Sequence, residues 1–314
     1  MRGGGAVTIE SPFEGGGEWL RCALHAHTTN SDGELSPERL ALHYERAGYD
    51  VLCITDHWVR TELPQQVGSI VVIPGTELNA SIGDDGRDAH VLALGVRSDP
   101  LEPGARFPTL LETVAWIEVN GGLPFLAHPY WSGVRTADFL DCPGLLGLEV
   151  FNAGCELEIG RGLAAICWDE ALEASLPLLG LATDDSHLPG FDSGFASVWV
   201  RAGERSADAV LDALRRGRFY SSTGPRIVAV ELDDEGVTVR CSAAASVGLV
   251  SVRMLGARVN AGRMGYASRG RILAEDGDGI VAARLERWSS MPYGRVEVRD
   301  AAGKTAWTNP LWLH

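Results

Sequence analysis

The chain has 314 residues, 45% hydrophobic and 22% charged, which suits a globular protein with one large barrel or two domains. Its net charge of −15 argues against nucleic acid as a main partner, because nucleic-acid binding needs a basic surface. No apolar run approaches the roughly eighteen residues of a membrane helix, and the Gly-rich start lacks the apolar middle of a secretory signal. We therefore expect a cytoplasmic protein with no membrane partner.

Several enzyme classes are excluded by residues that the chain lacks. The only lysine is Lys304, so the first 225 residues cannot perform Schiff-base or pyridoxal chemistry. The chain also contains no GxxxxGK[ST], GxGxxG or GxSxG pattern, which removes three common types of phosphate, dinucleotide and serine-nucleophile site.

Short apolar runs alternate with helical stretches after residues 1–17, which we predict to be a flexible segment. The helix between the first two runs has Ser36 at its N-cap, Pro37 at the first helical position and Gly48 after its end. Further helices are predicted over residues 109–119, 157–174 and 207–216. The runs resemble strands buried on both faces, as in parallel sheets, at residues 20–24, 51–54, 70–73, 123–127, 145–151, 178–182 and 196–200. This alternation predicts an α/β barrel or wound sheet over residues 18–225.

The pattern changes at residue 226. Segments such as IVAVELDD, GVTVRCSA, LVSVRML, GIVAARLE and GRVEVRD alternate in polarity between Gly, Asp or Ser turns. Residues 1–225 carry 32 acidic and 15 basic side chains, whereas residues 226–314 carry 10 and 12. We predict a second, all-β domain over residues 226–314, built as a small sandwich.

Polar side chains follow the predicted strands of the first domain. His25 and His27 come directly after the first run and point to the same side of an extended chain. The others that lie at or after strand ends are Asp32, His57, Glu77, His128, Asp185 and His187. Barrel enzymes build their sites at the carboxyl ends of parallel strands, so we expect these side chains to meet.

His90 instead begins the run HVLALGV. If that run pairs antiparallel with the strand ending at Glu77, and residues 78–89 form a loop, His90 returns to the same rim. One histidine at a strand end is usually only a polar loop residue, but six among eight histidines are not explained by chance. Histidine with carboxylate suits zinc, manganese or iron, and nine ligands are too many for one ion. Two or three divalent metal ions are therefore expected.

The motifs HAHTTNSDG, ITDH, PGTE, AHP and DDSH, in this order, resemble those of the polymerase and histidinol phosphatase (PHP) superfamily. The resemblance covers residues 20–225 and implies a distorted (β/α)7 barrel, similar to a TIM barrel. It implies one metal bound by His25, His27, Glu77 and Asp185. A second would share Glu77 and add His90 and His128, and a third would take Asp32, His57 and His187.

The resemblance also implies hydrolysis by a metal-bridged hydroxide. The residues expected to be catalytic are His25, His27, Glu77, Asp185 and His187. Asp184 is an alternative to Asp185, but the family's Asp-x-His pattern selects Asp185. Asp56 is expected either to orient a ligand or to pair at the surface.

Substrate-binding residues are less evident from the sequence. Arg135 follows His128 closely and is a candidate for pairing with a phosphate through both guanidinium nitrogens. Tyr130 and Trp131 are candidates for the pocket wall, and Arg60 and Arg218 are further cation candidates.

Three functions remain open. The first is a phosphoesterase for a small phosphorylated metabolite or nucleotide. The second is a carbamate or ester hydrolase, because GRFYSSTGP and the tail ending WTNPLWLH resemble the carbaryl-hydrolase branch of the family. The third is a non-catalytic protein that binds metal or carbohydrate, against which the complete ligand set counts.

Overall fold

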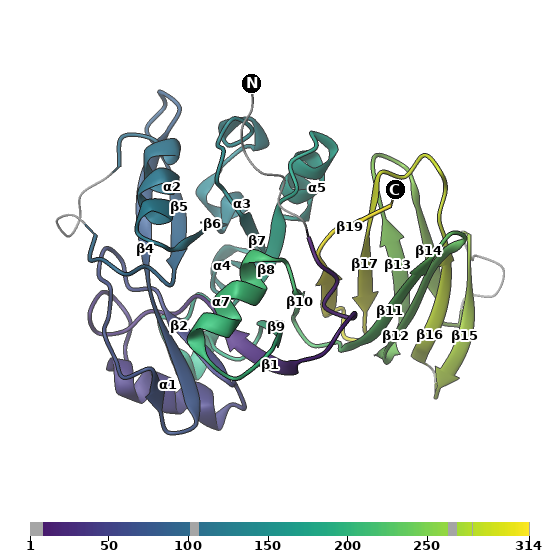
Figure 1. Cartoon of the computed structure of the whole chain (residues 1–314), viewed down its shortest axis with the longest axis horizontal. Coiled ribbons are helices and arrows are strands. Elements are labelled where there is room, and N and C mark those ends of the chain that lie inside the picture. Colours follow the sequence, from purple (N-terminus) through teal and green to yellow (C-terminus); the bar gives the residue numbers. More distant parts are fainter. Residues whose placement is uncertain (1–8, 101–106, 263–268, 278, 314) are drawn as a thin grey trace.

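The computed structural model describes residues 9–100, 107–262, 269–277 and 279–313. Before residue 226 the strands are β1 (Glu18–Ala23), β2 (Val51–Ile54), β3 (Gln66–Val67), β4 (Ile70–Ile82), β5 (Arg87–Leu94), β6 (Leu123–Ala127), β7 (Gly147–Asn152), β8 (Leu179–Thr183), β9 (Ser197–Ala202) and β10 (Phe219–Ser222). The helices are α1 (Pro37–Arg46), α2 (Leu110–Val119), α3 (Pro129–Ser132), η1 (Thr136–Asp138), α4 (Ala153–Ile159), α5 (Ala165–Glu173), α6 (Pro189–Asp192) and α7 (Ala207–Arg215). This part is therefore a mixed α/β fold (Figure 1).

The strands of this part form a sheet of mixed direction. β1 pairs parallel with β2 and β2 with β4, and β6, β7 and β8 are parallel neighbours. β5 pairs antiparallel with β4, the arrangement considered for the run that begins at His90, and it is also antiparallel to β6. β9 was expected to be parallel, but it pairs antiparallel with β1 and β10.

The distorted (β/α)7 barrel that the resemblance implied does not close among the described residues. In the described chain no ladder joins β8 to β9 or β10, and one isolated bridge, Ala26 to Ser186, links the ends of β1 and β8. A serine side chain occupies the place of a strand neighbour: the Ser221 hydroxyl donates to Gly180 O (2.8 Å) and accepts from Ala182 N (3.0 Å). β10 is free to pair on its other edge with β18 (Thr305–Thr308), so the sheet continues past residue 225 instead of closing.

Two further boundaries differ from expectation. β4 continues beyond Glu77 to Ile82 because residues 78–82 alternate apolar and polar side chains, so most of the predicted loop 78–89 is a hairpin. The helix predicted over residues 157–174 is two helices. α4 ends at Gly160, whose φ of +70° suits a glycine, and residues 162–164 return along β7 before α5 begins.

The core lies on both sides of the sheet. Helices contribute one apolar face each, for example Leu40 and Tyr44 of α1 and Val210 and Leu214 of α7. Side chains buried together inside the sheet include Leu20, Cys22, Val51, Cys53, Leu92, Phe125, Leu181, Val198 and Phe219. This packing fixes the strand ends that carry the polar residues.

The chain from residue 226 onward contains β11 (Ile227–Asp233), β12 (Gly236–Ala244), β13 (Ser246–Val250), β14 (Gly256–Asn260), β15 (Gly270–Asp276), β16 (Gly279–Glu286), β17 (Tyr293–Arg299), β18 and β19 (Leu311–Trp312). β11, β12, β16 and β15 form a four-stranded sheet. It packs against β14, β13 and β17 through a core that includes Val237, Val247, Leu249, Leu285 and Val296. The predicted β module is thus two packed sheets, at the right in Figure 1.

The proposed division at residue 225 stays a prediction, and β10–β18 hydrogen bonds cross it. Of the segment predicted to be flexible, residues 1–8 lie outside the described residues. Residues 9–17 make specific contacts: Glu10 N donates to Arg216 O (2.8 Å), and the Phe13 ring stacks on Tyr220. Among the described helices, none has the length and apolar character needed to cross a membrane.

Candidate metal centre

The polar residues that follow the strands meet at one end of the sheet. His25 and His27 are held against the end of β8, because His27 N donates to Ser186 O (2.9 Å) and Asp185 N to His25 O (3.1 Å). Trp58 N donates to Glu77 O (3.0 Å), which holds the segment carrying His57 beside β4. His90 lies opposite Asn79 in the β4–β5 hairpin. The structure therefore brings all nine predicted ligands together.

Glu77 stands between two sets of imidazoles. Its Oε2 lies 3.2 Å from His25 Nε2, 3.3 Å from His27 Nε2 and 3.4 Å from His57 Nδ1. Its Oε1 lies 2.8 Å from His90 Nδ1 and 3.1 Å from His128 Nε2. Each oxygen of one buried carboxylate thus faces a different group of nitrogens, which is the arrangement that a bridging ligand requires.

The innermost group has the dimensions of a metal site. His25 Nε2 and His27 Nε2 lie 3.1 Å apart, and Asp185 Oδ1 is 3.0 and 3.2 Å from them. Ligand atoms of a tetrahedral site with bonds of about 2.1 Å lie about 3.4 Å apart, so these four atoms, with Glu77 Oε2, need little adjustment around one cation. His27 Nδ1 and Asp185 Oδ1 are buried without a hydrogen bond. The residues present fit a bound metal.

A second group lies toward solvent. Asp32 Oδ1 is 3.5 Å from His187 Nε2 and Oδ2 is 3.6 Å from His57 Nε2. His27 Nδ1 also faces Asp32 Oδ1 at 3.6 Å, so His27 lies between this outer group and the inner one. The outer carboxylate is half exposed, which makes this the most accessible of the clusters.

Asp56 is fully buried and organises the loop that carries Asp32. Its carboxylate accepts hydrogen bonds from Thr28 N (2.6 Å), Thr28 Oγ1 (2.7 Å) and Ser31 Oγ (2.8 Å), and from Thr61. Ser31 lies between Asp56 and Asp32, because its hydroxyl is also 3.1 Å from Asp32 Oδ1. Of the two roles foreseen for Asp56, the geometry matches orientation of a ligand loop.

Asp184, the alternative to Asp185, faces away from the cluster. Its carboxylate accepts from the backbone N–H groups of Gly194, Phe195 and Ala196 and from the Tyr44 hydroxyl. Asp184 therefore holds the loop after β8 rather than contributing a ligand.

Three residues of the site have left-handed backbones that side chains rarely adopt. They are Trp58 (φ +58°), His128 (φ +26°) and Asp185 (φ +54°), each at the end of a strand or directly after a ligand. Such conformations cost about 1–3 kcal/mol each and persist where neighbouring contacts hold them. The chain therefore accepts strained backbone at two proposed ligands, His128 and Asp185, and directly after a third, His57.

Carboxylates control the protonation of the cluster. Burial by itself lowers the pKa of His27, but the adjacent carboxylates of Asp185 and Glu77 outweigh it and raise the pKa to about 9. The pKa values of His25 and His128 are raised against burial in the same way. Burial raises the pKa of Glu77, yet the surrounding imidazoles hold it well below its usual value. A cation that binds these nitrogens must displace their protons.

Tyr130 and Trp131, the residues predicted to form the pocket wall, belong to α3, directly after His128. The Trp131 ring centroid is 5.1 Å from that of His128 and 6.3 Å from that of His90, and its indole N–H donates to Glu158 (2.9 Å). Tyr130 is half exposed, with the Arg161 guanidinium 5.4 Å from its ring centre.

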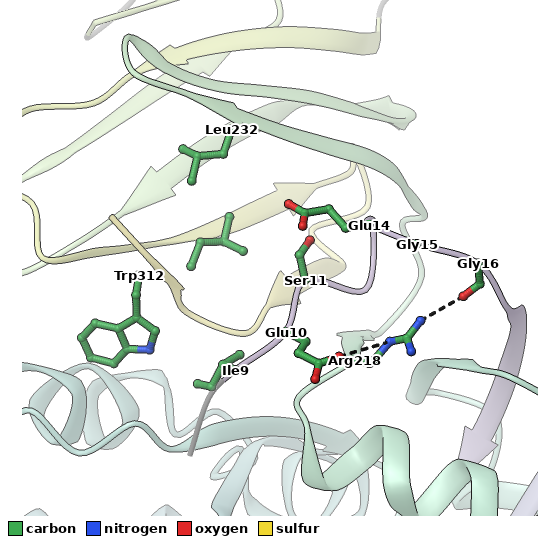
Figure 2. Close-up of a pocket in the computed structure, with 10 residues that line it drawn as sticks. Ile9, Glu10, Ser11, Glu14, Gly15, Gly16, Arg218, Leu232 and Trp312 are labelled. Carbon is green, nitrogen blue, oxygen red and sulfur yellow. Dashed lines mark hydrogen bonds and ion pairs between the residues drawn. The ribbon is translucent and has the colours of Figure 1, made fainter. Parts of the chain in front are cut away.

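The three predicted arginines differ in position. Arg135 is exposed at the start of η1, just beyond α3, and its contact with substrate stays a prediction. Arg60 pairs with Glu62 and, at 3.4 Å, with Asp99. Arg218 lies at the opposite end of the sheet, where it donates to Gly16 O (2.9 Å) beside Glu10 (Figure 2). β9 runs antiparallel to β1, and β10 runs antiparallel to β9, so Arg218 before β10 lies at the end of the sheet away from the proposed ligands. Its contact with substrate stays a prediction.

Glu149 is a residue of the centre that the sequence analysis missed. It is fully buried in β7, and its Oε1 lies 2.7 Å from His25 Nδ1. Its Oε2 accepts from His128 N and from Asn152 Nδ2, both at 2.8 Å. One carboxylate thus orients His25 and holds the left-handed backbone of His128. A lone glutamate inside the apolar run LLGLEVF was the available signal.

We expect Glu149→Gln to weaken metal binding by about 10–100-fold, because the neutral amide no longer stabilises the Nδ1–H tautomer that leaves His25 Nε2 free to coordinate. Competition with a chromogenic chelator measures this change. Glu112→Gln, on the exposed face of α2, is the matched control and should bind metal as the unmodified chain does. Equal affinities of the two variants would contradict an orienting role for Glu149.

No family model and no curated protein matches the sequence. A two-domain protein from Bacteroides vulgatus, described as containing a predicted PHP-like metal-dependent phosphoesterase, matches in structure with a TM-score of 0.54 and 17% identity over 97% of this chain and 98% of its own. An amidohydrolase from Chromobacterium violaceum, solved with sulfate and no metal, covers 55% of this chain and 89% of its own (TM-score 0.42, 18% identity). A predicted metal-dependent phosphoesterase from Bifidobacterium adolescentis covers 62% and 96% (TM-score 0.42, 17% identity).

The match to the Bacteroides protein extends over both parts of the chain and concerns the fold. The resemblance to PHP proteins that the motifs predicted is therefore confirmed at the level of fold, including the additional β module.

Proposed function

We propose that the protein is a metal-dependent phosphoesterase that hydrolyses a small phosphorylated metabolite or nucleotide with two or three divalent transition-metal ions. The observation that carries this proposal is the convergence of five histidines on the two oxygens of Glu77. The name given to the Bacteroides protein, a PHP-like metal-dependent phosphoesterase, supports the same reaction class.

The chain's own residues divide into groups around Glu77. His25, His27 and Asp185 would hold one ion with Glu77 Oε2, and His90 and His128 a second with Oε1. Asp32, His57 and His187 would hold the outer ion. Zinc, manganese and iron all suit this mixture of imidazole and carboxylate. Such ions, when bound, lower the pKa of a coordinated water and polarise a phosphoryl oxygen.

Arg135 is the proposed phosphate partner. We expect Arg135→Ala to raise KM for a phosphomonoester by about tenfold or more, the equivalent of a charge-assisted hydrogen bond of about 1.5–3 kcal/mol. Steady-state kinetics on the metal-loaded protein measures the change, and inorganic phosphate should inhibit competitively. Arg218→Ala is the matched control, since Arg218 lies at the far end of the sheet. An unchanged KM in Arg135→Ala would remove Arg135 from the site.

A carbamate or ester hydrolase is the second candidate. It is favoured by the engagement of Arg60 with acidic side chains and by the distance of Arg218, since a neutral substrate needs no guanidinium partner. A panel of phosphoesters and aryl carbamates, tested with metal-analysed protein, separates the two. Cleavage of a carbamate without turnover of any phosphoester would reverse their order.

A further inference from the structure

Asn152 ends β7 beside the metal centre and is fully buried. Its Oδ1 accepts a hydrogen bond from Cys155 N (2.9 Å), which makes Asn152 the N-cap of α4. Its Nδ2 lies 2.8 Å from Glu149 Oε2 and 3.1 Å from Asp185 Oδ2. One short amide therefore contacts the start of a helix and two buried carboxylates at the same time.

The partners of Asn152 determine which way its amide faces. A backbone N–H can only donate, so the atom opposite Cys155 N must be the amide oxygen. Ionised carboxylates can only accept, so the atom that faces Glu149 and Asp185 must be the amide nitrogen. This nitrogen carries two hydrogens, which suffice for one bond to each carboxylate. Both N–H groups and the oxygen of the amide are thus in use.

The backbone of Asn152 is fixed as well. Asn152 N donates to Gly162 O (3.0 Å), and Asn152 pairs with Thr183 of β8 in the parallel ladder. Gly162 lies so close that an added Cβ would meet Asn152 O at 2.2 Å. The amide is therefore held in place independently of the two carboxylates that it contacts, as a positioning group requires.

The two oxygens of Asp185 have different surroundings. Oδ1 faces the inner ligands, His25 Nε2 at 3.0 Å and His27 Nε2 at 3.2 Å, and is buried without a hydrogen bond. Oδ2 accepts from Asn152 and lies 3.9 Å from His128 Nε2, the nitrogen assigned above to the second ion. Because the amide occupies Oδ2, Oδ1 is the oxygen that is available to a cation.

We propose that Asn152 is a positioning residue that restricts Asp185 to coordination of the inner ion through one oxygen. By holding Oδ2, the amide keeps Asp185 from turning toward His128, so that Asp185 serves the inner group alone while Glu77 serves both groups. The same amide places an N–H between Asp185 and Glu149, two buried anions that repel each other without it. This inference rests on the proposed function only for the presence of the metal centre, and it concerns binding and not turnover.

Asn152→Ser tests this role, because serine can still cap α4 but is too short to bond to both carboxylates. We expect the affinity for Zn²⁺, measured by competition with a chromogenic chelator, to fall by about 10–100-fold. The visible absorption of the Co²⁺-loaded protein should weaken per bound ion, since tetrahedral Co²⁺ absorbs more strongly than Co²⁺ with more ligands. Asn152→Thr, a second capping residue without the amide, should behave in the same way. Ser206→Ala, which removes the N-cap of α7, is the matched control and should change neither measurement.

A double-mutant cycle separates the positioning of Asp185 from a general loss of stability. If Asn152 acts through Asp185, Asn152→Ser should cost less Zn²⁺ affinity in the Asp185→Ala background than in the unmodified chain. Equal costs in both backgrounds, or an unchanged affinity and Co²⁺ spectrum in Asn152→Ser, would overturn the positioning role even if phosphoester turnover is observed. The expected losses of affinity without turnover of any phosphoester would support this role and sink the phosphoesterase proposal.

Discussion

Glu77→Ala is expected to remove metal from two positions at once. Both oxygens of Glu77 face imidazoles, Oε2 toward His25 and His27 and Oε1 toward His90 and His128. Without this carboxylate, both groups of imidazoles lose the ligand that they share. Because an outer hydrogen-bond partner alone is worth about 10–100-fold in metal affinity or activity, we expect a larger loss of turnover from removing the shared ligand. Elemental analysis of protein purified without chelator measures the ions per chain.

Asp32→Ala is the matched control for that experiment. Asp32 faces His57 and His187 and is half exposed, so its loss should affect only the outer position. Glu77→Gln, which keeps the side-chain volume, separates metal loss from a packing defect, with thermal unfolding as the readout. The multinuclear proposal fails if the unmodified protein holds at most one ion per chain in every growth medium, or if both alanine variants lose the same single ion.

The sequence was most informative where local pattern and tertiary structure agree. β2 and β6 have the predicted bounds, because short apolar runs between turn residues are buried on both faces. The sequence also predicts that His25, His57, His128 and His187 lie near one another. Each of these histidines follows the end of a strand in one sheet. The strand ends alone predict this clustering, and no side-chain contact has to be known.

Other features depend on contacts between distant segments. Beside β8 the Ser221 hydroxyl bonds to Gly180 O and Ala182 N where a neighbouring strand would pair, and no local pattern distinguishes this serine from its neighbours. The position of Arg218 could not be read from the sequence, because the direction of β10 is set by its pairing with β9 and not by its own residues. Glu149 was missed because its partners, His25 and the backbone of His128, are 124 and 21 residues away.

Arg295 connects the β module to the α/β part. Replacing it is expected to destabilise the folded chain strongly. Its side chain is 1% exposed in β17. Its guanidinium donates to Asp169 of α5 (2.6 Å) and to Glu297 (2.6 Å), and lies 4.9 Å from the ring centre of buried Trp168. Because its removal leaves Asp169 without its cation and Glu297 with Arg258 alone, we expect Arg295→Met to lower the free energy of unfolding by about 3–5 kcal/mol.

Arg258→Met is the matched control for Arg295, since Arg258 also pairs with Glu297 (2.8 Å) but is 38% exposed. An exposed pair contributes about 0–1 kcal/mol, so this variant should stay close to the unmodified protein in urea unfolding. Adding Asp169→Asn and Glu297→Gln to Arg295→Met should restore part of the lost stability, because the amides do not leave buried charges unpaired. Equal losses in the two methionine variants would mean that Arg295 acts through its aliphatic stem and not through its charge.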